Sequence, residues 1–356
     1  MDVNQIIRGS LNEVAPGVWY VPALMANLYF VGDRNGPWVM VDAGTPGTAW
    51  RIREAAHELF GTRAPEAIVL THGHFDHVGA LKELAEGWNV PVFAHPLEFP
   101  YLDGRDNYPP PDPTVGGFMA QLSRVFPKSG INISSRLHAI MIDNTIPHLQ
   151  GWRAVHTPGH TPGHISLFRD EDRVLIAGDA VITIDQQNPS RLLTQIREFH
   201  GPPQYFTPDW AQAHESIRTL AHLRPRVVAT GHGLPMSGDD VADKLTMLAE
   251  TFQPPSKGRY VGNPALADAQ GVYYVPPATR DRAPMYAAGI AVAAAGLLLV
   301  NSRRKGSRAS AEPGTGSMLP DPGQPKTATL GSGSMLPDPP LPKERVAFDN
   351  SRRRRS

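Results

Sequence analysis

The stretch Thr71-His72-Gly73-His74-Phe75-Asp76-His77 is the most informative part of this sequence. It places three histidines and one aspartate within six positions, directly after the apolar run 67–70 and before a run with helical spacing. Imidazole nitrogens and carboxylate oxygens are common ligands of zinc and iron. The first two histidines alternate in an extended turn and so point the same way, whereas the aspartate and the last histidine lie at the start of the helix. The stretch therefore predicts a site for one or two metal ions, and a polar loop with incidental histidines is the weaker interpretation.

Three later strand-like runs end in a similar way, at glycines beside histidines or an aspartate. The segments that follow them are Thr157-Pro158-Gly159-His160-Thr161-Pro162-Gly163-His164, Gly178-Asp179 and Gly231-His232. Glycine allows the backbone to turn sharply where a buried strand ends. Because strand ends commonly gather at one rim of an α/β architecture, we expect these polar side chains to lie near the first cluster.

The residues around these motifs alternate between β-branched or aromatic runs and runs with helical spacing. Strands are predicted at residues 18–21, 28–31, 38–41, 67–71, 152–156, 166–168, 173–177 and 226–230. Helices are predicted at residues 49–60, 78–88, 209–222 and 239–252. This order of elements indicates an α/β fold, with one domain over residues 1–252.

The motifs and their order resemble those of the metallo-β-lactamase-fold hydrolases, especially the glyoxalase II-like branch. Val41-Asp42-Ala43-Gly44 also resembles an early turn of that family, and the resemblance covers about residues 14–252. It implies an αβ/βα four-layer sandwich, in which two mixed β-sheets are flanked by helices.

The resemblance also implies a role for each candidate ligand. One metal ion would be bound by His72, His74 and His160 and a second by Asp76, His77 and His232, with Asp179 bridging both. Asp76 and Asp179 would carry the catalytic roles, and Asp42 would orient the ligand loop.

Three further histidines lie close to the motifs in sequence. His156 and His164 are expected to pack behind the ligands or to support them. His95 follows a predicted strand and is expected to be structural, with a site-lining role as the alternative.

Two divalent ions that share Asp179 would also share a bridging water, whose pKa falls from about 15.7 towards about 7. The bridging hydroxide would attack an electrophilic carbonyl, so the predicted reaction is hydrolysis of a thioester, an ester or a lactone. Zinc is the default metal, with iron or manganese as alternatives. The chain has no cysteine, which is no obstacle because the metal generates the nucleophile.

The substrate branches of the family are harder to separate. Glyoxalase II enzymes bind glutathione through basic residues in a C-terminal helical region, and no matching cluster precedes Phe252. The bridging Asp179 counts against a β-lactamase, and Ile182 stands where the lactonases of this fold have a tyrosine.

Other functions were weighed against a hydrolase. A catalytically degenerate, membrane-tethered binding module of the same fold is the main alternative, but all seven ligand positions are filled. A β-lactamase-like or phosphodiesterase member is a further alternative, whereas a nucleic-acid-processing member is disfavoured because residues 1–300 have a net charge of −6. We expect a small-molecule substrate and no nucleic-acid partner, and the sequence does not fix the oligomeric state.

Four segments lie outside the domain pattern. Residues 96–135 are rich in proline and glycine and are predicted to form a lid or pocket wall. Residues 253–284 are predicted as a Pro-rich linker and residues 301–356 as a disordered basic tail. Residues 285–300 carry no charge and are predicted as a membrane helix, although a spanning helix typically needs about 17–25 residues. Because no export signal is visible, we expect a cytoplasmic catalytic domain anchored to a membrane near its C-terminal end.

Overall fold

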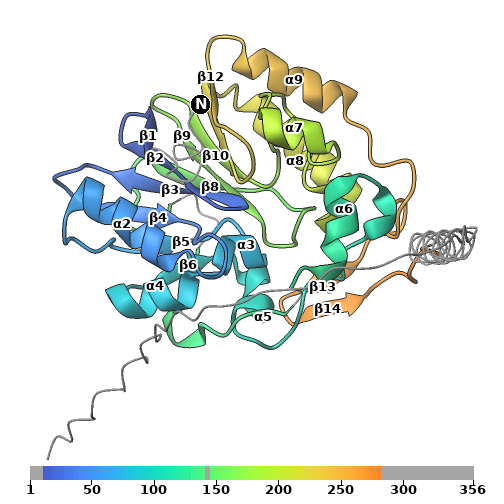
Figure 1. Cartoon of the computed structure of the whole chain (residues 1–356), viewed down its shortest axis with the longest axis horizontal. Coiled ribbons are helices and arrows are strands. Elements are labelled where there is room, and N and C mark those ends of the chain that lie inside the picture. The colour runs from blue at the N-terminus through green and yellow to red at the C-terminus, as the bar shows by residue number, and fades with distance from the viewer. Residues whose placement is uncertain (1–10, 128, 141–144, 282–356) are drawn as a thin grey trace, which may run out of the picture. The chain divides into compact units, whose positions relative to one another are not determined.

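Strands whose side chains alternate between two apolar environments form two β-sheets that lie face to face (Figure 1). The computed structural model describes residues 11–127, 129–140 and 145–281. The seven strands of the first sheet follow one another in chain order and are antiparallel up to β4 and parallel beyond it. They are β1 (Asn12–Ala15), β2 (Val18–Ala23), β3 (Ala26–Gly32), β4 (Trp38–Val41), β5 (Ile68–Val69), β6 (Val92–Ala94) and β7 (Leu137–Ala139).

The second sheet has five strands in the order β12-β11-β10-β9-β8. They are β8 (Trp152–His156), β9 (Ile165–Arg169), β10 (Val174–Gly178), β11 (Val227–Thr230) and β12 (Met236–Ser237). Only the pair β10–β11 is parallel in this sheet. Both sheets are therefore mixed, as the sequence predicts.

The alternation of side chains along β3 shows how the first sheet is covered on both faces. Leu28 and Phe30 pack against the outer helices, whereas Tyr29 and Val31 pack into the core between the sheets. The outer helices of this side are α2 (Ala49–Phe60) and α4 (Leu81–Trp88). Each buries the apolar stripe that its helical spacing predicts.

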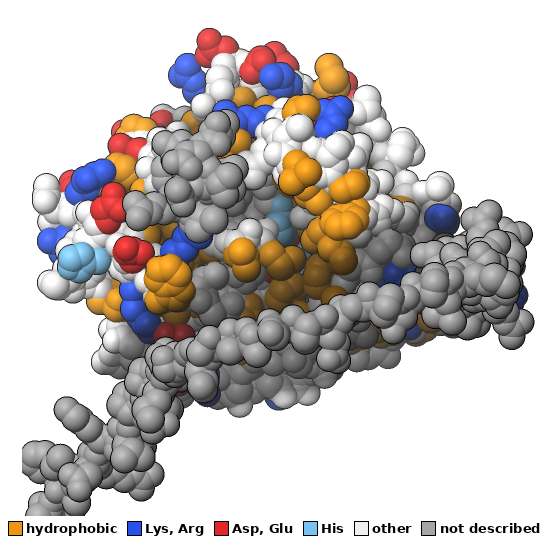
Figure 2. All heavy atoms as spheres, in the orientation of Figure 1, with side chains coloured by type: hydrophobic (Ala, Val, Ile, Leu, Met, Phe, Trp, Pro, Cys, Tyr) orange, Lys and Arg blue, Asp and Glu red, His pale blue; other side chains and the backbone are white. Residues whose placement is uncertain are grey.

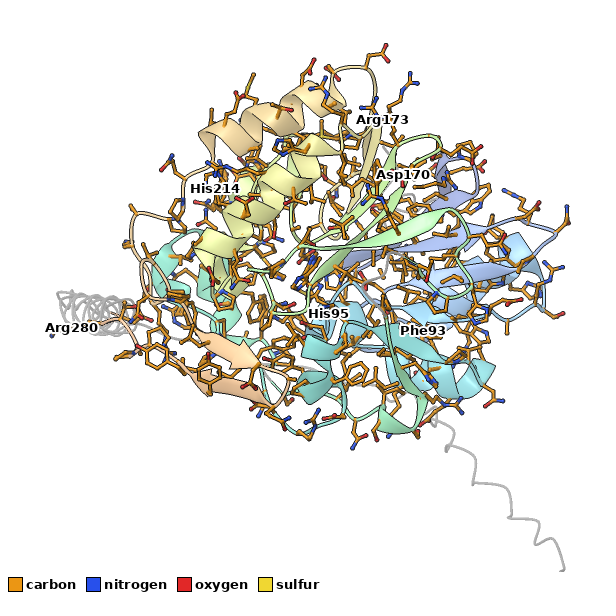
Figure 3. All side chains as sticks on the ribbon, turned by 180° about the vertical axis from the view of Figure 1, so that it is seen from behind. Phe93, His95, Asp170, Arg173, His214 and Arg280 are labelled. Carbon is orange, nitrogen blue, oxygen red and sulfur yellow. The ribbon has the colours of Figure 1, made fainter. Side chains whose placement is uncertain are left out.

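The second sheet repeats this arrangement along β10. Val174 and Ile176 face the core between the sheets, while Leu175 and Ala177 face two helices that lie side by side in Figure 3. These helices are α8 (Trp210–His222) and α9 (Val241–Thr251). Two sheets with helices on both outer faces form the αβ/βα four-layer sandwich, so the predicted fold class is confirmed.

The helix predicted at residues 78–88 begins earlier and is interrupted. It is divided into α3 (Phe75–Val78) and α4 by Gly79 and Ala80. A Cβ atom at Gly79 would lie 2.1 Å from the backbone nitrogen of Pro46, so the two segments approach too closely for a side chain. The early start places the last two polar residues of the histidine-rich loop on α3.

The segment 96–135, called the insertion here, folds into short helical turns beside the sheets. These are η1 (Pro96–Glu98), α5 (Phe99–Leu102), η2 (Pro113–Val115), α6 (Phe118–Leu122), η3 (Ser123–Val125) and the first residues of η4 (Ser134–Arg136). Two further short helices, α7 (Pro189–Thr194) and η5 (Gln204–Phe206), lie between β10 and α8.

Residues 253–281, called the strap here, pack against the insertion. The strap contains the hairpin of β13 (Leu266–Asp268) and β14 (Gly271–Tyr274). Its polar contacts with the insertion include backbone hydrogen bonds from Arg259 to Asp112 and from Val272 to Asp106, and the 2.6 Å ion pair of Asp281 with Arg124.

The predicted membrane segment, residues 285–300, and the predicted tail, residues 301–356, lie outside the described residues. Across the part of the chain that the structure describes, no helix combines the length and apolar character needed to cross a bilayer. Membrane anchoring is thus unsupported and stays a prediction.

Candidate metal centre

Asp42 lies beneath the histidine-rich loop and holds both of its ends. It follows β4 with a left-handed backbone (φ 63°), and its side chain is buried. Oδ1 accepts a hydrogen bond from the Thr71 N–H at 2.8 Å, and Oδ2 accepts one from the Thr71 hydroxyl at 2.8 Å. Oδ2 also lies 2.9 Å from Nδ1 of His77. The carboxylate therefore fixes the direction in which His77 presents its other nitrogen, Nε2.

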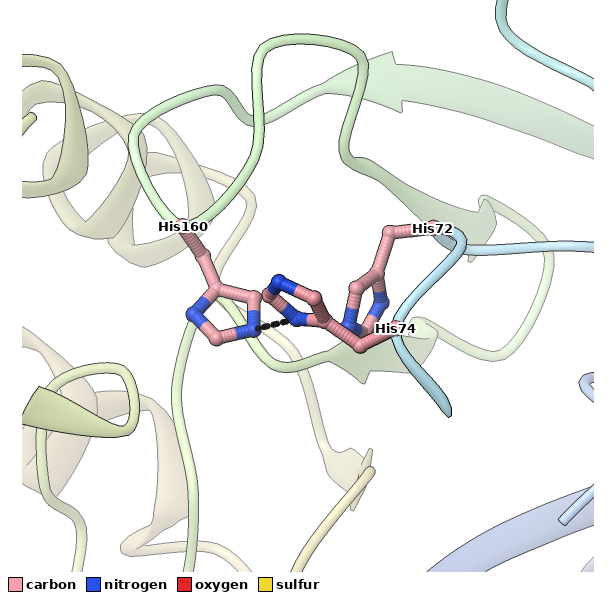
Figure 4. A group of neighbouring side chains, drawn as sticks. All are labelled: His72, His74 and His160. Carbon is pink, nitrogen blue, oxygen red and sulfur yellow. Dashed lines mark hydrogen bonds between the residues drawn. The ribbon is translucent and has the colours of Figure 1, made fainter. Parts of the chain in front are cut away.

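His72, His74 and His160 form a first group of converging nitrogens (Figure 4). Their ligand atoms lie within 4.8 Å of one another, and Nδ1 of His74 is 2.9 Å from Nε2 of His160. The rear nitrogens of two rings are held in place. The Thr71 hydroxyl lies 3.0 Å from Nδ1 of His72, and the Thr207 hydroxyl lies 3.3 Å from Nδ1 of His160. These contacts orient both rings so that Nε2 faces the centre.

Asp179 lies between this first group and a second one. Asp76, His77 and His232 form the second group, again with ligand atoms within 4.8 Å of one another. Oδ2 of Asp179 is 3.0 Å from Nε2 of His232 and 3.4 Å from Nε2 of His160. Oδ1 is 3.5 Å from Nε2 of His77. One carboxylate therefore faces ligand atoms of both groups.

The last ligand turn, Gly231-His232, is fixed by two close approaches. A Cβ atom at Gly231 would lie 2.0 Å from Oδ1 of Asp179, so this position requires glycine. Nδ1 of His232 lies 2.8 Å from the carbonyl oxygen of Met25, in the turn between β2 and β3. With this contact, the structure brings together all seven residues predicted from sequence: His72, His74, Asp76, His77, His160, Asp179 and His232.

The unpaired atoms of this cluster fit divalent cations. Nε2 of His72, Nε2 of His77 and Oδ1 of Asp179 are buried and have no hydrogen-bond partner among the described residues. An unsatisfied buried polar group costs about 1–3 kcal/mol, so three in one place call for ligands. Imidazole nitrogens together with carboxylate oxygens suit zinc, iron or manganese. The donor set therefore fits the metal ions that the sequence predicts.

The ionisation of the first group and of Asp179 also suits metal binding. Burial lowers the pKa of His72 and His160 well below the ordinary value and that of His74 to about 3, so all three are neutral. Burial alone would raise the pKa of Asp179, but the neighbouring His232 and His77 outweigh burial and hold it well below its usual range. Neutral imidazoles and an ionised carboxylate are the forms that bind metals.

Glu98 is a functional residue that the sequence analysis missed. Its side chain is fully buried and joins three segments of the chain. Oε2 accepts hydrogen bonds from the Gly73 N–H at 3.0 Å and from the Tyr108 hydroxyl. Oε1 accepts hydrogen bonds at 2.8 Å from the Thr161 hydroxyl and from the Gly163 N–H. Glu98 therefore ties the loop of His72 and His74 to the loop of His160.

Aromatic residues form a wall beside His74. The Tyr108 ring, from the insertion, lies with its centroid 4.5 Å from that of His74, and the Phe206 ring stacks on His74 at 4.6 Å. Phe75 and Phe126 continue this aromatic group. Through Tyr108, the insertion thus contacts a candidate ligand.

His156, His164 and His95 surround the cluster without belonging to it. Nε2 of His164 accepts a hydrogen bond from the Asp179 N–H at 2.9 Å, so His164 holds the backbone of a candidate ligand. His95, labelled in Figure 3, stacks on His156 with ring centroids 4.5 Å apart. Nε2 of His156 lies 2.9 Å from the carbonyl oxygen of Pro162. His156 thus contacts the T-P-G-H segment, and His95 packs against His156. His164, which belongs to that segment, holds Asp179.

The remaining histidines of the described chain are absent from every group of converging ligand atoms: His57, His138, His148, His200, His214 and His222.

Comparisons with known proteins agree with this geometry. The description "Metallo-beta-lactamase superfamily" matches residues 21–232. The chain belongs to the metallo-β-lactamase superfamily. The superfamily resemblance inferred from the motifs is therefore confirmed.

Two curated relatives place the chain more closely within the superfamily. It is 47% identical over 253 residues to the "Probable metallo-hydrolase YflN" of Bacillus subtilis, covering 70% of this chain and 96% of that protein. It is 31% identical over 164 residues to the "Hydroxyacylglutathione hydrolase" of Erwinia tasmaniensis, covering 46% of this chain and 50% of that protein. The family match and these two relatives together show that the protein is a metal-dependent hydrolase.

Among solved structures, a β-lactamase domain protein from Burkholderia ambifaria is 25% identical to the chain. The alignment covers 68% of this chain and 76% of that protein, with a TM-score of 0.47.

Proposed function

We propose that the protein is a binuclear metal-dependent hydrolase that cleaves a carbonyl substrate, namely a thioester, an ester or a lactone. The observation that carries this proposal is the position of Asp179, whose two oxygens face ligand atoms of both groups at 3.0–3.5 Å. When bound, two divalent cations polarise the substrate carbonyl and lower the pKa of a water molecule to about 7.

The chain's own residues prepare this site in three ways. Asp42, Thr71 and Thr207 bind the rear nitrogens of the ligand rings and so fix their direction. The two carboxylates, Asp76 and Asp179, partly offset the charge of two dications. Burial raises the pKa of Asp76, which suits its carboxylate to take up the proton that the attacking water releases.

A thioester is the substrate that we would test first. One relative named above is a hydroxyacylglutathione hydrolase, although the alignment covers only half of that protein. A degenerate binding module would not need seven buried candidate ligands, three of which have unpaired atoms, so catalysis is the function that the cluster favours.

Metal analysis of the purified full-length protein tests the proposal. We expect two equivalents of metal after loading with zinc, iron or manganese, and hydrolysis of at least one member of a panel of thioesters, esters and lactones. Asp179→Ala should retain at most one equivalent and lose most activity. His214→Ala, which removes a histidine on α8 away from the cluster, is the matched control and should change neither. One equivalent in the fully loaded wild type would overturn the binuclear assignment.

A further inference from the structure

A cleft of about 470 Å³ opens directly beside His232. Aliphatic side chains from four segments line it, from the turn between β2 and β3, from α6, from the segment after β10 and from α7. They include Leu24, Met25, Met119, Ile184 and Leu192. In Figure 2, hydrophobic side chains gather over α6 and α7 around a hollow in which a histidine side chain is visible. An apolar surface therefore leads to the candidate metal centre.

Leu24 is placed unfavourably on two counts. It occupies the two-residue turn between the paired residues Ala23 and Ala26 with φ 67°, a left-handed conformation that disfavours a bulky side chain. Its side chain is also 80% exposed. Neither the backbone nor the core of the protein benefits from leucine here, and such strain concentrates at binding sites. The next residue, Met25, binds His232 through its carbonyl oxygen, which couples this turn to the metal centre.

Arg51 supplies a cation to the same cleft. It is partly exposed on α2, and its guanidinium group makes no ion pair or hydrogen bond with another described residue. Arg53, two positions along the same helix, is instead paired with Glu83 at 2.7 Å. The cleft therefore combines an aliphatic wall with one uncommitted positive charge.

We propose that this cleft binds an amphiphilic substrate, with an aliphatic acyl chain against Leu24, Ile184 and Leu192 and an anionic group at Arg51. This substrate class rests on the proposed hydrolase function, whose reaction would add water to the carbonyl carbon beside His232 and break its single bond to the leaving sulfur or oxygen. An apolar chain is taken up because its transfer from water is favourable by about 0.8 kcal/mol per buried CH₂ group. An anion at Arg51 adds a charge-assisted hydrogen bond and fixes the orientation of the chain.

Four thioesters separate the two parts of this proposal. Octanoyl and acetyl thioesters are each prepared with 3-mercaptopropionate, which is anionic, and with 3-mercaptopropanol, which is neutral. Metal-loaded wild type should prefer the octanoyl thioester of the anionic thiol. Equal kcat/KM for all four compounds would overturn the proposal.

Arg51→Gln tests the charge. The ratio of kcat/KM for the anionic octanoyl thioester to that for the neutral one should fall about tenfold or more, mainly through KM, because a hydrogen bond to a charged group is lost. Arg51→Lys should recover much of the ratio. Arg53→Gln removes the same charge from the same helix outside the cleft and is the matched control. A ratio that falls equally in both glutamine variants would contradict a specific role for Arg51.

Leu24→Asn tests the aliphatic wall. Asparagine tolerates a left-handed backbone better than leucine, so the melting temperature should stay level or rise. The preference for octanoyl over acetyl thioesters should nevertheless fall several-fold. A merely structural role of Leu24 would leave this preference unchanged, and that result would contradict the proposal.

A binding measurement separates this inference from the proposed function. Octane-1-sulfonate carries an aliphatic chain and an anion but no bond to hydrolyse, and its binding to the metal-loaded protein can be measured by calorimetry. Binding that is weakened by Arg51→Gln and by Leu24→Asn, in a protein that cleaves none of the panel, would support the cleft as a binding site and refute the proposed cleavage of thioesters, esters and lactones. If the wild type cleaves members of the panel and neither Arg51→Gln nor Leu24→Asn has an effect, the proposed hydrolysis is supported and the cleft is refuted as the binding site.

Discussion

The T-P-G-H segment contains the same four residues twice, yet the two copies have different tasks. His160, in the first copy, points its Nε2 at His74 and Asp179. His164, in the second copy, uses its Nε2 to accept the Asp179 N–H, and its Nδ1 lies 2.8 Å from the Thr157 hydroxyl. Both rings are buried, so burial does not distinguish them.

The backbone around each copy explains the difference. Gly159 has φ 123°, and a Cβ atom there would lie 2.2 Å from the backbone nitrogen of Ala213, so the first copy is pressed against α8. Gly163 instead donates its N–H to Glu98. Identical tetrapeptides are thus turned in different directions by what each one packs against, and only the first reaches the centre.

The largest expected effect comes from replacing His160 and His164, one at a time, with alanine. His160→Ala removes a ligand of the first group, and we expect metal content to fall to about one equivalent. Activity should fall about 10³-fold, because a cation contributes several kcal/mol to the transition state. His164→Ala should keep two equivalents but lose about 3 kcal/mol of unfolding free energy, through a cavity and an unpaired Asp179 N–H.

Elemental analysis and denaturant unfolding of the two variants check this contrast. If His164→Ala lost metal as readily as His160→Ala, the proposed difference between the two histidines would be contradicted, because His164 would then act on the ions directly.

An intermediate effect is expected for Glu98→Gln, which alters the contact that holds the second copy. The amide keeps one acceptor oxygen but turns a donor towards groups that themselves donate. We expect about 2 kcal/mol less unfolding free energy and about 10–100-fold weaker metal binding, as for other residues that orient ligands. Chelator competition measures the second quantity. Thr161→Val removes one of the four hydrogen bonds and should cost only about 1 kcal/mol; equal effects in both variants would argue against a shared role of the Glu98 carboxylate.

The smallest effect concerns pH and the histidine pair behind the second copy. Burial, and then the neighbouring His156, lower the pKa of His95 to about 4. Below about pH 6.5 the unfolded chain takes up a proton that the folded chain does not, so stability should fall as the pH drops towards 4. His95→Asn keeps an acceptor for the Leu97 N–H but cannot titrate there, and its unfolding free energy should depend less on pH in this range. Parallel pH profiles for wild type and variant would show that His95 does not contribute.

The sequence could predict the parts of the molecule that are coded locally. Short runs of β-branched and aromatic residues predict strands such as β3, and the histidine-rich loop with the later glycine turns predicts the seven residues that the structure brings together. Each signal lies within a few neighbouring positions. The predicted roles of these residues as metal ligands stay predictions.

The missed contributors depend on contacts between distant positions. Glu98 lies 65 residues before Gly163, and nothing next to it in sequence indicates a contact with either ligand loop. Thr207 contacts His160 and Phe206 contacts His74. Both contacts arise only because the chain at η5 packs beside the ligand cluster. The cleft escaped prediction for the same reason, since Leu24, Arg51 and Leu192 converge only in the folded chain.

The strap has a consequence for the order of events during protein synthesis. Every candidate ligand, up to His232, leaves the ribosome before residues 253–281 do. The strap contacts the insertion through Asp106, Asp112 and Arg124, and the insertion carries the Tyr108 ring against His74. The nascent chain therefore contains every candidate ligand before the segment that fastens the Tyr108 wall has been synthesised.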